Sequence, residues 1–371
     1  MWLVFSGLSP VILKKNNMKK VAQITINSKS IVFPFVSVII PTYNSIRTIG
    51  KCLKSVSNQN YPKSKMEVII IDGYSTDKTL QVIKETKLKI KVINGKYPKD
   101  PEACKGEGLA MAKGEIVCLL DSDNYLLHKN WFRKMIVPLM KDKELVGSYP
   151  WRFAYRRYDK ILNRYFSLIG AADPVALYLG KADKLSYVSD KWTLYGKVIS
   201  DFKDYFVIQF DKEHFPTLGS SGFFARKKTL LKGKADIEHF FHIDVPFDLN
   251  KMGINKYAIV RDVVVHDTAE ELKSFLRKRV KYMRIHYEGR AKDRRYKVFD
   301  PTKKEDLFRL FVAVIFAFTF IEPLFFSIRG YVRIQDRAWF VHPFFFFAIV
   351  LAYLTAVIIS RFEKLKNLIK R

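Results

Sequence analysis

Residues 36–44 read VSVIIPTYN, a run of apolar and mostly branched side chains that stops at Pro41. A strand that is apolar on both faces is typical of a buried parallel sheet, and proline fits its end. Similar short apolar runs recur downstream. The pattern predicts further strands at 67–71, 90–93 and 116–120, and helices at 46–56, 78–85 and 109–112. Strand–helix alternation with short connections predicts an α/β fold with a mainly parallel sheet and right-handed crossovers.

Polar residues gather where these strands end. Asp121-Ser122-Asp123-Asn124 follows the strand at 116–120 directly, and Asp72 follows the strand at 67–71. In open α/β sheets, ligands bind beyond the carboxyl ends of the strands. We therefore expect Asp72 and the Asp121/Asp123 pair to converge on one cleft at the edge of the sheet.

Asp121 and Asp123 are the strongest chemical signal. Two carboxylates one residue apart at a strand end can point toward a shared hard cation, which prefers oxygen ligands. A divalent ion held there could bridge a diphosphate and neutralise charge on a leaving nucleotide. A pair with this spacing is also common in plain turns, so its position after a buried strand is what favours the metal interpretation.

The turns after the first two strands offer a nucleotide-binding surface. Asp72 could accept hydrogen bonds from a nucleotide base, whereas Asp77 is expected to cap the following helix. Tyr43 could lie against a base or a ribose. A strand-terminating turn explains Pro41 and Asn44 equally well.

Three segments in the same order and register resemble the family 2 glycosyltransferases, which have the GT-A fold. They are VSVIIPTYN at 36–44, IIIDGYSTDKT at 69–79 and GLAMAKGEIVCLLDSDN at 108–124. A looser resemblance continues through 219–222, Asp244 and His266 into the apolar C-terminal segments. The resemblance covers most of the chain, and three motifs in register are far more specific than one.

The resemblance implies an inverting displacement at an anomeric carbon, with a nucleotide-sugar donor of the UDP or GDP type and Mg²⁺ or Mn²⁺. By that likeness, Asp121 and Asp123 would hold the metal. The nucleotide-sugar would contact Pro41, Thr42, Tyr43, Asn44, Asp72, Lys105, Asp121 and Ser122.

The resemblance also places a general base at Asp244, with Asp248 as a nearby competitor. A positioned carboxylate would assist an acceptor hydroxyl that attacks an oxocarbenium-like centre. His266 ends a β-branched run and could approach the metal or the diphosphate, or it could be a structural histidine.

The sequence departs from the family pattern at three places. Many relatives carry Arg-Asn where this chain has Lys105-Gly106, although Lys105 could still act as a point charge. Ser45 replaces the usual acidic residue after Asn44. Processive synthases carry Q-x-x-R-W, and the nearest equivalent at 278–282 lacks both Gln and Trp. We therefore expect transfer of a single sugar.

The composition agrees with a folded protein that meets an anionic partner. The 371 residues include 65 Lys and Arg against 36 Asp and Glu, a formal net charge of +29. A membrane surface, phosphorylated substrates or nucleic acid would fit this charge. The aromatics lack the stacking signatures of RNA-binding modules, so we expect no nucleic acid. The cysteines at 52, 104 and 118 suggest neither a disulfide framework nor a zinc site.

Two apolar segments near the C-terminus, 307–328 and 339–360, are each 22 residues long and qualify by length as transmembrane helices. The alternative is a pair of buried globular helices. The flanks on both sides are basic, so two crossings would place both of them in the cytoplasm. This predicts a multi-pass protein of the cell membrane with a cytoplasmic catalytic domain. Glu322 should face protein or the interface.

The predicted layout has an N-terminal extension at 1–30, a GT-A domain at 31–299 and the transmembrane hairpin with its basic tail at 300–371. A nucleotide-binding half at 31–125 precedes an acceptor half at 126–299, and the structure of 151–215 is not evident from the sequence. Translation is expected to start at Met18. The basic segment 270–295 could lie on an anionic membrane and steer the site toward a lipid-linked or other glycan acceptor, or it could be a solvated helix.

Two rivals to this reading remain open. One is an enzyme of the same fold that makes a polyprenyl-phosphate or dolichyl-phosphate sugar. The other is a membrane-tethered nucleic-acid-binding protein, for which the net charge is the only support.

Overall fold

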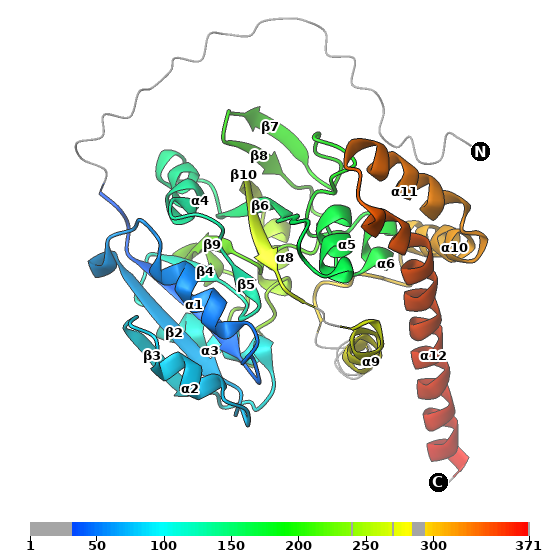
Figure 1. Ribbon diagram of the computed structural model, residues 1–371, viewed down its shortest axis with the longest axis horizontal. Helices are drawn as coiled ribbons and strands as arrows, with labels where there is room; N and C mark the ends of the chain where they lie inside the picture. Colours follow the sequence, from blue (N-terminus) through cyan, green and yellow to red (C-terminus); the bar gives the residue numbers. More distant parts are fainter. Residues whose placement is uncertain (1–31, 239, 269–270, 284–293, 370–371) are drawn as a thin grey trace, which may run out of the picture. The chain divides into compact units, whose positions relative to one another are not determined.

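The computed structural model describes residues 32–238, 240–268, 271–283 and 294–369. The elements described below lie in the unit Pro34–Arg371 (Figure 1). The strands are β1 Val36–Thr42, β2 Met66–Asp72, β3 Ile90–Asn94, β4 Ile116–Leu119, β5 Asn124–Tyr125, β6 Gly147–Phe153, β7 Lys197–Asp201, β8 Tyr205–Gln209, β9 Phe223–Arg226 and β10 Lys256–His266. The helices are α1 Ile49–Ser57, α2 Thr79–Lys84, α3 Pro101–Met111, α4 Trp131–Lys141, α5 Ile161–Ile169, α6 Pro174–Tyr178, α7 Lys227–Leu230, α8 Asp244–Lys251, α9 Leu272–Tyr282, α10 Lys304–Thr319, α11 Ile321–Arg333 and α12 His342–Ile369, with 3-10 turns η1 Lys63–Lys65 and η3 Arg337–Val341.

These strands form one sheet in the order β3-β2-β1-β4-β9-β6-β10-β8-β7, and β5 pairs with β10. The four strands predicted from the sequence are parallel neighbours, which confirms the α/β class. The second half of the sheet is mixed, because β9 runs antiparallel to both β4 and β6 while β10 runs parallel to β6. Pro41 is tolerated within β1 because the pairing with β4 ends at Ile39.

The predicted helix boundaries differ most at α3. The sequence predicted a helix only at 109–112, whereas α3 begins at Pro101 and Asp100 caps it by accepting the backbone N–H groups of Glu102 and Ala103. Charged residues on α3, among them Glu102 and Lys105, are buried. Buried charge hides the apolar periodicity by which a helix is recognised.

The region 151–215 contains α5, α6 and the β7–β8 hairpin. Buried side chains of α5 and α6, such as Tyr165 and Tyr178, form one apolar cluster with α10 and with Trp339, Phe345 and Phe346 near the start of α12. A separate core contains residues from both halves of the sheet. The C-terminal helices therefore pack on the acceptor half of the chain rather than on the nucleotide-binding half.

The segment 307–328 is not one straight helix, so the first predicted membrane span is not confirmed as a single helix. α10 and α11 meet at an angle of 80°, and Phe320 between them has a left-handed backbone with φ 61°. Pro323 lies in the first turn of α11, where its missing N–H group costs nothing. A hydropathy average depends only on composition, so it does not detect that one helix ends at Phe320 and a new helix begins there.

The second apolar segment forms one long helix. Arg337–Phe362 is the single stretch in the described residues that is long and apolar enough to cross a membrane as one helix. Its first part is anchored to the protein: His342 is buried and contacts the hydroxyls of Tyr165 at 2.8 Å and Tyr178 at 2.9 Å. Glu322 also bonds to Tyr178, as expected for a carboxyl group that faces protein. The structure therefore does not confirm the predicted transmembrane hairpin, because only the second of its two segments is a single unbroken helix.

Candidate active site

The loops after β1 and β4 meet at the carboxyl edge of the sheet. The Ser45 hydroxyl lies 2.8 Å from the Ser122 hydroxyl, and the Cys52 thiol lies 3.9 Å from the Asp121 carbonyl oxygen. The contact follows from the register, because β1 and β4 are parallel neighbours and end at the same edge. Asp121 and Asp123 are thus placed beside the loop that carries Tyr43.

Asp72 is buried at the end of β2 and holds the turn that follows it. Its two carboxylate oxygens accept hydrogen bonds from the Ser75 N–H at 2.8 Å and the Ser75 hydroxyl at 2.6 Å. Asn44 ties this turn to the β1 loop by accepting the Thr76 N–H at 2.8 Å. Asp77 accepts the Thr79 N–H at 3.0 Å, as predicted for a helix start. Asp72 therefore shapes the turn and sits next to the Tyr43 loop.

Tyr43 is partly exposed, and the Lys99 ammonium lies 5.6 Å from the centroid of its ring. Pro41 and Thr42 are residues of β1 itself and are buried, and no described residue is hydrogen-bonded to the Thr42 hydroxyl. An exposed aromatic ring beside a cation is suited to stacking on a base next to a phosphate.

Lys105 connects Asp121 to the first turn of α3. Its buried ammonium lies 3.0 Å from the Asp121 carboxylate and 3.1 Å from the Glu102 carboxylate. Burial acts to raise the pKa of Asp121, but the Lys105 charge, the His242 charge and the hydrogen bond from Lys105 together hold that pKa below its ordinary value. The buried Lys105 ammonium therefore favours the ionised form of Asp121.

The end of β10 brings His266 to Asp123. His266 is paired with Asn124 of β5, and its Nε2 atom lies 3.6 Å from an Asp123 carboxylate oxygen. Burial and the neighbouring Asp121 raise the pKa of Asp123 above its ordinary value. No described residue is hydrogen-bonded to the buried Nδ1 atom of His266. The pairing β5–β10 thus places His266 beside the Asp123 carboxylate.

These residues fit a divalent cation that is completed by its substrate. In the described part of the chain, no three His, Cys, Asp or Glu side chains are grouped closely enough to hold a metal by themselves. Mg²⁺ is usually held by one or two carboxylates together with substrate phosphates and waters. Asp121 and Asp123 satisfy that requirement, and the shifted pKa of Asp123 shows that a counter-charge there would be favourable.

Asp244 lies in a different environment from the one predicted for it. It is buried, and its carboxylate accepts hydrogen bonds from the Arg294 guanidinium at 3.1 Å and from the Arg295 N–H at 3.0 Å. Asp248 pairs with the Arg295 side chain at 2.6 Å. A general base needs a carboxylate that reaches the acceptor hydroxyl. Asp244 and Asp248 stay predictions for that role, and in this structure each is paired with an arginine.

Sequence reasoning missed the pair formed by Glu102 and His242. Both Glu102 carboxylate oxygens lie 2.8 Å from the Nδ1 atom of His242. No motif marks either residue. The first turn of α3 is charged and buried. A search for apolar periodicity does not detect a helix start of this kind.

Comparisons with known proteins find glycosyltransferases. Residues 37–211 match the model of glycosyl transferase family 2. Glycosyltransferase AglE of Haloferax volcanii is 33% identical over 140 residues, which are 35% of this chain and 46% of that protein. The GalNAc(5)-diNAcBac-PP-undecaprenol beta-1,3-glucosyltransferase of Campylobacter jejuni is 37% identical over 98 residues, which are 25% of this chain and 31% of that protein.

Among solved structures, the mannosyltransferase PcManGT of Pyrobaculum calidifontis, in complex with GDP-Man and Mn²⁺, is similar with a TM-score of 0.49 and 15% identity over 87% of each chain. The chain spans less than half the length of the curated relatives named above. The family match covers the segment in which the polar residues at the ends of β1, β2 and β4 lie at one edge of the sheet. Through residues 37–211, this chain is a member of glycosyl transferase family 2.

Proposed function

We propose that this chain transfers a single sugar, with inversion, from a UDP- or GDP-sugar to a hydroxyl of a lipid-linked or other membrane-proximal glycan. The observation that carries the proposal is the meeting of the β1 loop, Asp121 and Asp123, and His266 at one edge of the sheet. Tyr43 and the turn shaped by Asp72 would receive the nucleoside. Pro41, Thr42, Asn44 and Ser122 would form the floor of that site, and Lys105 would support Asp121.

Mg²⁺ or Mn²⁺ held by Asp121 and Asp123 would neutralise charge on the diphosphate as it leaves. The relatives support the substrate classes: one is named for a polyprenyl-diphosphate-linked acceptor, and another solved relative holds UDP-GlcNAc. His266 would approach the same charged group from β10.

Donor binding by the full chain in detergent provides the direct test. We expect UDP-glucose, UDP-N-acetylglucosamine or GDP-mannose to raise the unfolding temperature when Mn²⁺ is present, and EDTA to abolish the shift. A ligand at about one hundred times its Kd stabilises the folded state by about 2.7 kcal/mol. Equal shifts from Mn²⁺ alone and from Mn²⁺ with every nucleotide-sugar would contradict the proposed donor class.

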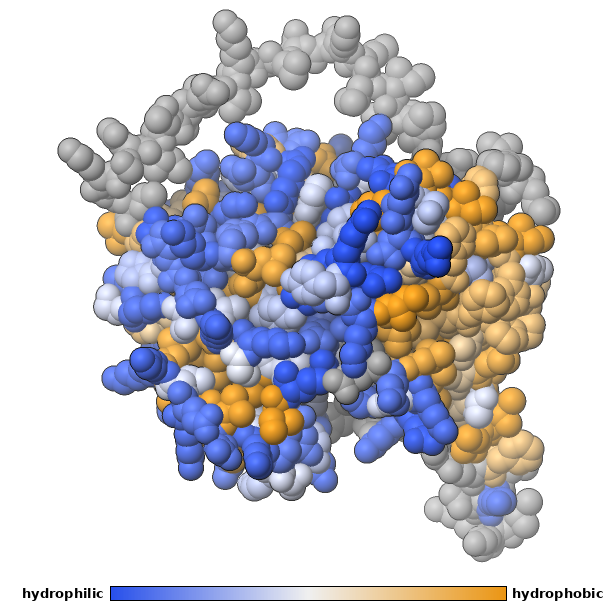
Figure 2. Space-filling model, viewed as in Figure 1, coloured by the Kyte–Doolittle hydropathy of each residue, from blue (hydrophilic) through white to orange (hydrophobic). Residues whose placement is uncertain are grey.

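The C-terminal helices expose apolar faces that fit a membrane. The exposed residues include Phe308, Phe311, Ile315 and Phe318 of α10, Ile321, Leu324, Phe325, Ile328 and Val332 of α11, and Phe344, Leu354, Ile358 and Phe362 of α12. The residues of α10 recur at three- and four-residue intervals, so this helix presents one apolar stripe. Figure 2 shows apolar surface gathered over these helices. A contiguous exposed apolar surface marks a contact with lipid or with another protein.

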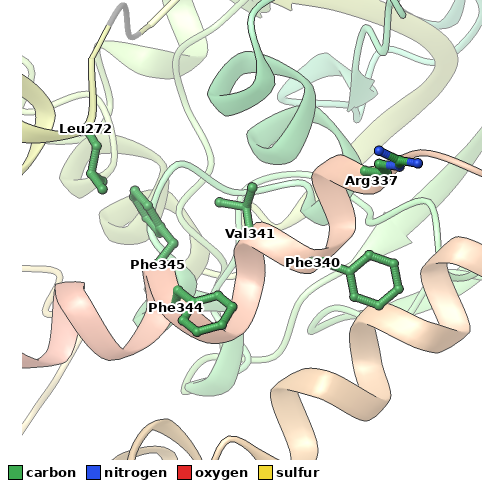
Figure 3. A pocket seen from close by; sticks show the side chains of 6 residues that line it. All are labelled: Leu272, Arg337, Phe340, Val341, Phe344 and Phe345. Carbon is green, nitrogen blue, oxygen red and sulfur yellow. The ribbon is translucent and has the colours of Figure 1, made fainter.

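A groove between α9 and α12 would suit the apolar chain of a lipid-linked acceptor (Figure 3). Its volume is about 330 Å³, and it is lined by Leu272, Arg337, Phe340, Val341, Phe344 and Phe345. Arg337 is the one charged side chain in this lining and could pair with a lipid phosphate. The same groove would serve a polyprenyl-phosphate acceptor, and a radiolabelled donor given with dolichyl phosphate distinguishes the two. The rest of the basic segment 270–295 lies partly outside the described residues.

The charge of the flanks argues for helices that enter and leave the membrane on one side. Basic residues occur along α9 and in the tail after Ser360, and the positive-inside tendency places both at the cytoplasmic face. A single crossing by α12 would separate them. We therefore propose a cytoplasmic catalytic domain whose bent α10–α11 pair and α12 lie in the cytoplasmic leaflet, as interfacial helices do. The predicted start at Met18 and the extension at 1–30 lie outside the described residues.

A fluorescent label on α11 tests this arrangement. All three native cysteines are buried, so a thiol-reactive dye will mark an introduced cysteine. We expect Phe325→Cys, where the native side chain is 50% exposed, to be quenched in proteoliposomes by nitroxide lipids, more strongly by shallow than by deep nitroxides. Leu231→Cys, at 51% exposure after α7, is the matched control and should not be quenched. Equal quenching at the two sites would refute membrane contact through α11. If a dye at Ile358→Cys is quenched more strongly by deep than by shallow nitroxides, α12 crosses the membrane instead of lying in the interface.

A further inference from the structure

We propose that His242, oriented by Glu102, is the general base that accepts the proton of the attacking hydroxyl; this inference rests on the proposed function. The Nδ1 atom of His242 lies 2.8 Å from both carboxylate oxygens of Glu102, and one of those oxygens also accepts the His242 backbone N–H at 2.8 Å. The carboxylate thereby fixes both the position and the tautomer of the ring. With a proton on Nδ1, the Nε2 atom carries the free electron pair.

Two glycines, Gly106 and Gly219, allow the backbone segments around Glu102 and His242 to approach each other closely. A Cβ atom at Gly106 of α3 would lie 2.8 Å from the Cβ atom of Phe240, and one at Gly219 would lie 2.1 Å from the His242 carbonyl oxygen. Gly219 also has a φ of +134°, which favours glycine. Asp100 caps α3 at the turn that carries Glu102. The two glycines and this cap let the loop before α8 lie directly on the start of α3.

The charges around the pair support a base rather than a plain structural contact. Burial acts to raise the pKa of Glu102, but His242 and Lys105 outweigh it and hold that pKa well below its ordinary value. Glu102 therefore stays ionised and can stabilise an imidazolium. Lys105 joins Glu102 to Asp121, and His242 is among the charges that lower the pKa of Asp121. The pair thus belongs to the same charge network as the donor-binding carboxylate.

The step that follows is balanced in atoms and electrons. The oxygen of the acceptor hydroxyl forms a bond to the anomeric carbon while the bond from that carbon to the diphosphate oxygen breaks. The electron pair of the broken bond leaves with the nucleoside diphosphate. The hydroxyl proton moves to Nε2 of His242, and Glu102 stabilises the resulting imidazolium until solvent removes the proton.

Asp183 is the competing base. It is half-buried between α6 and β7, burial raises its pKa above the ordinary value, and both His266 and His242 act on it electrostatically. No hydrogen bond to another side chain orients its carboxylate in the described structure. If His242 is the base, His242→Gln should lose activity; if Asp183 is the base, Asp183→Asn should lose it.

The test measures nucleotide release from the donor by the full chain in detergent with Mn²⁺, with water as the acceptor. The donor is whichever of UDP-glucose, UDP-N-acetylglucosamine and GDP-mannose binds. We expect His242→Gln, which can still donate to Glu102, to lower kcat at least about a hundredfold with little change in KM. Glu102→Gln should shift the acid limb of the kcat profile to lower pH, because an imidazolium without an anionic partner loses its proton more readily. Free imidazole should restore activity to His242→Ala.

His214→Gln is the matched control. His214 also pairs with two carboxylates, Asp211 at 3.0 Å and Glu305 at 3.1 Å, but its side chain is partly exposed. The kcat of the His214→Gln variant should therefore equal that of the unmodified chain. An unchanged kcat in His242→Gln overturns the assignment of the base while leaving the glycosyltransferase proposal intact. A hundredfold loss in Asp183→Asn alone transfers the role to Asp183. If no nucleotide-sugar binds to the unmodified chain, the proposed function itself fails and the base fails with it.

Discussion

Asp123→Asn should lower the rate of sugar transfer or donor hydrolysis by about a thousandfold at saturating Mn²⁺. A metal that stabilises the charge on a leaving diphosphate contributes several kcal/mol to the transition state, and each 1.4 kcal/mol is a factor of ten in rate. Asparagine keeps the size of the side chain beside His266 but removes the anionic ligand. The measurement is kcat against Mn²⁺ concentration, in which the variant should lose both its rate and its metal dependence.

The same substitution should leave the metal-free protein as stable as the unmodified chain, or more stable. Burial and Asp121 raise the pKa of Asp123, so the ionised carboxylate opposes folding at neutral pH and its removal relieves that cost. A loss of activity without a loss of stability separates metal binding from misfolding. Asp201→Asn on β7, the outermost strand beyond β10 and β8, is the control and should keep full activity. An Asp123→Asn variant with full Mn²⁺-dependent turnover would remove the metal role from this residue.

The residues at the carboxyl edge of the sheet could be predicted from the sequence, because each of them directly follows a short apolar strand. Each of the first four strands is a short apolar run, and their alternation with helices predicts that they are parallel and end at the same edge. A residue that directly follows such a run must lie at the carboxyl edge. This is why Asp72 and Asp121 could be placed near the loop that carries Tyr43 before their contacts were known.

The remaining site residues depend on contacts that no local pattern encodes. Glu102 and His242 are 140 residues apart in the chain, and their pairing requires α3 to begin earlier than its apolar residues indicate. His266 reaches Asp123 through the two-residue strand β5. The base predicted at Asp244 came from resemblance alone, and the structure surrounds that carboxylate with Arg294. The C-terminal break at Phe320 likewise follows from backbone geometry rather than from composition.

Gly219→Ala should be the most damaging single-methyl substitution near the site. The added Cβ would lie 2.1 Å from the His242 carbonyl oxygen, and the φ of +134° is unfavourable for alanine. Strained backbone and overpacking each cost about 1–3 kcal/mol, so we expect a loss of about 2–6 kcal/mol in the free energy of unfolding. The contact is with backbone and cannot be relieved by a rotamer change. The loop that carries His242 must move, and donor hydrolysis should fall with it.

Gly253→Ala separates these two costs, because Gly253 has a φ of +79° and no atom within 4 Å of an added Cβ. It therefore bears the conformational cost without the clash, and we expect a loss of about 1–2 kcal/mol with donor hydrolysis unchanged. Chemical denaturation of the two variants measures the difference, and donor turnover at equal folded fraction measures the displacement of His242. If both alanine variants lose the same stability and both keep full turnover, the close approach of Gly219 to His242 has no part in holding the base.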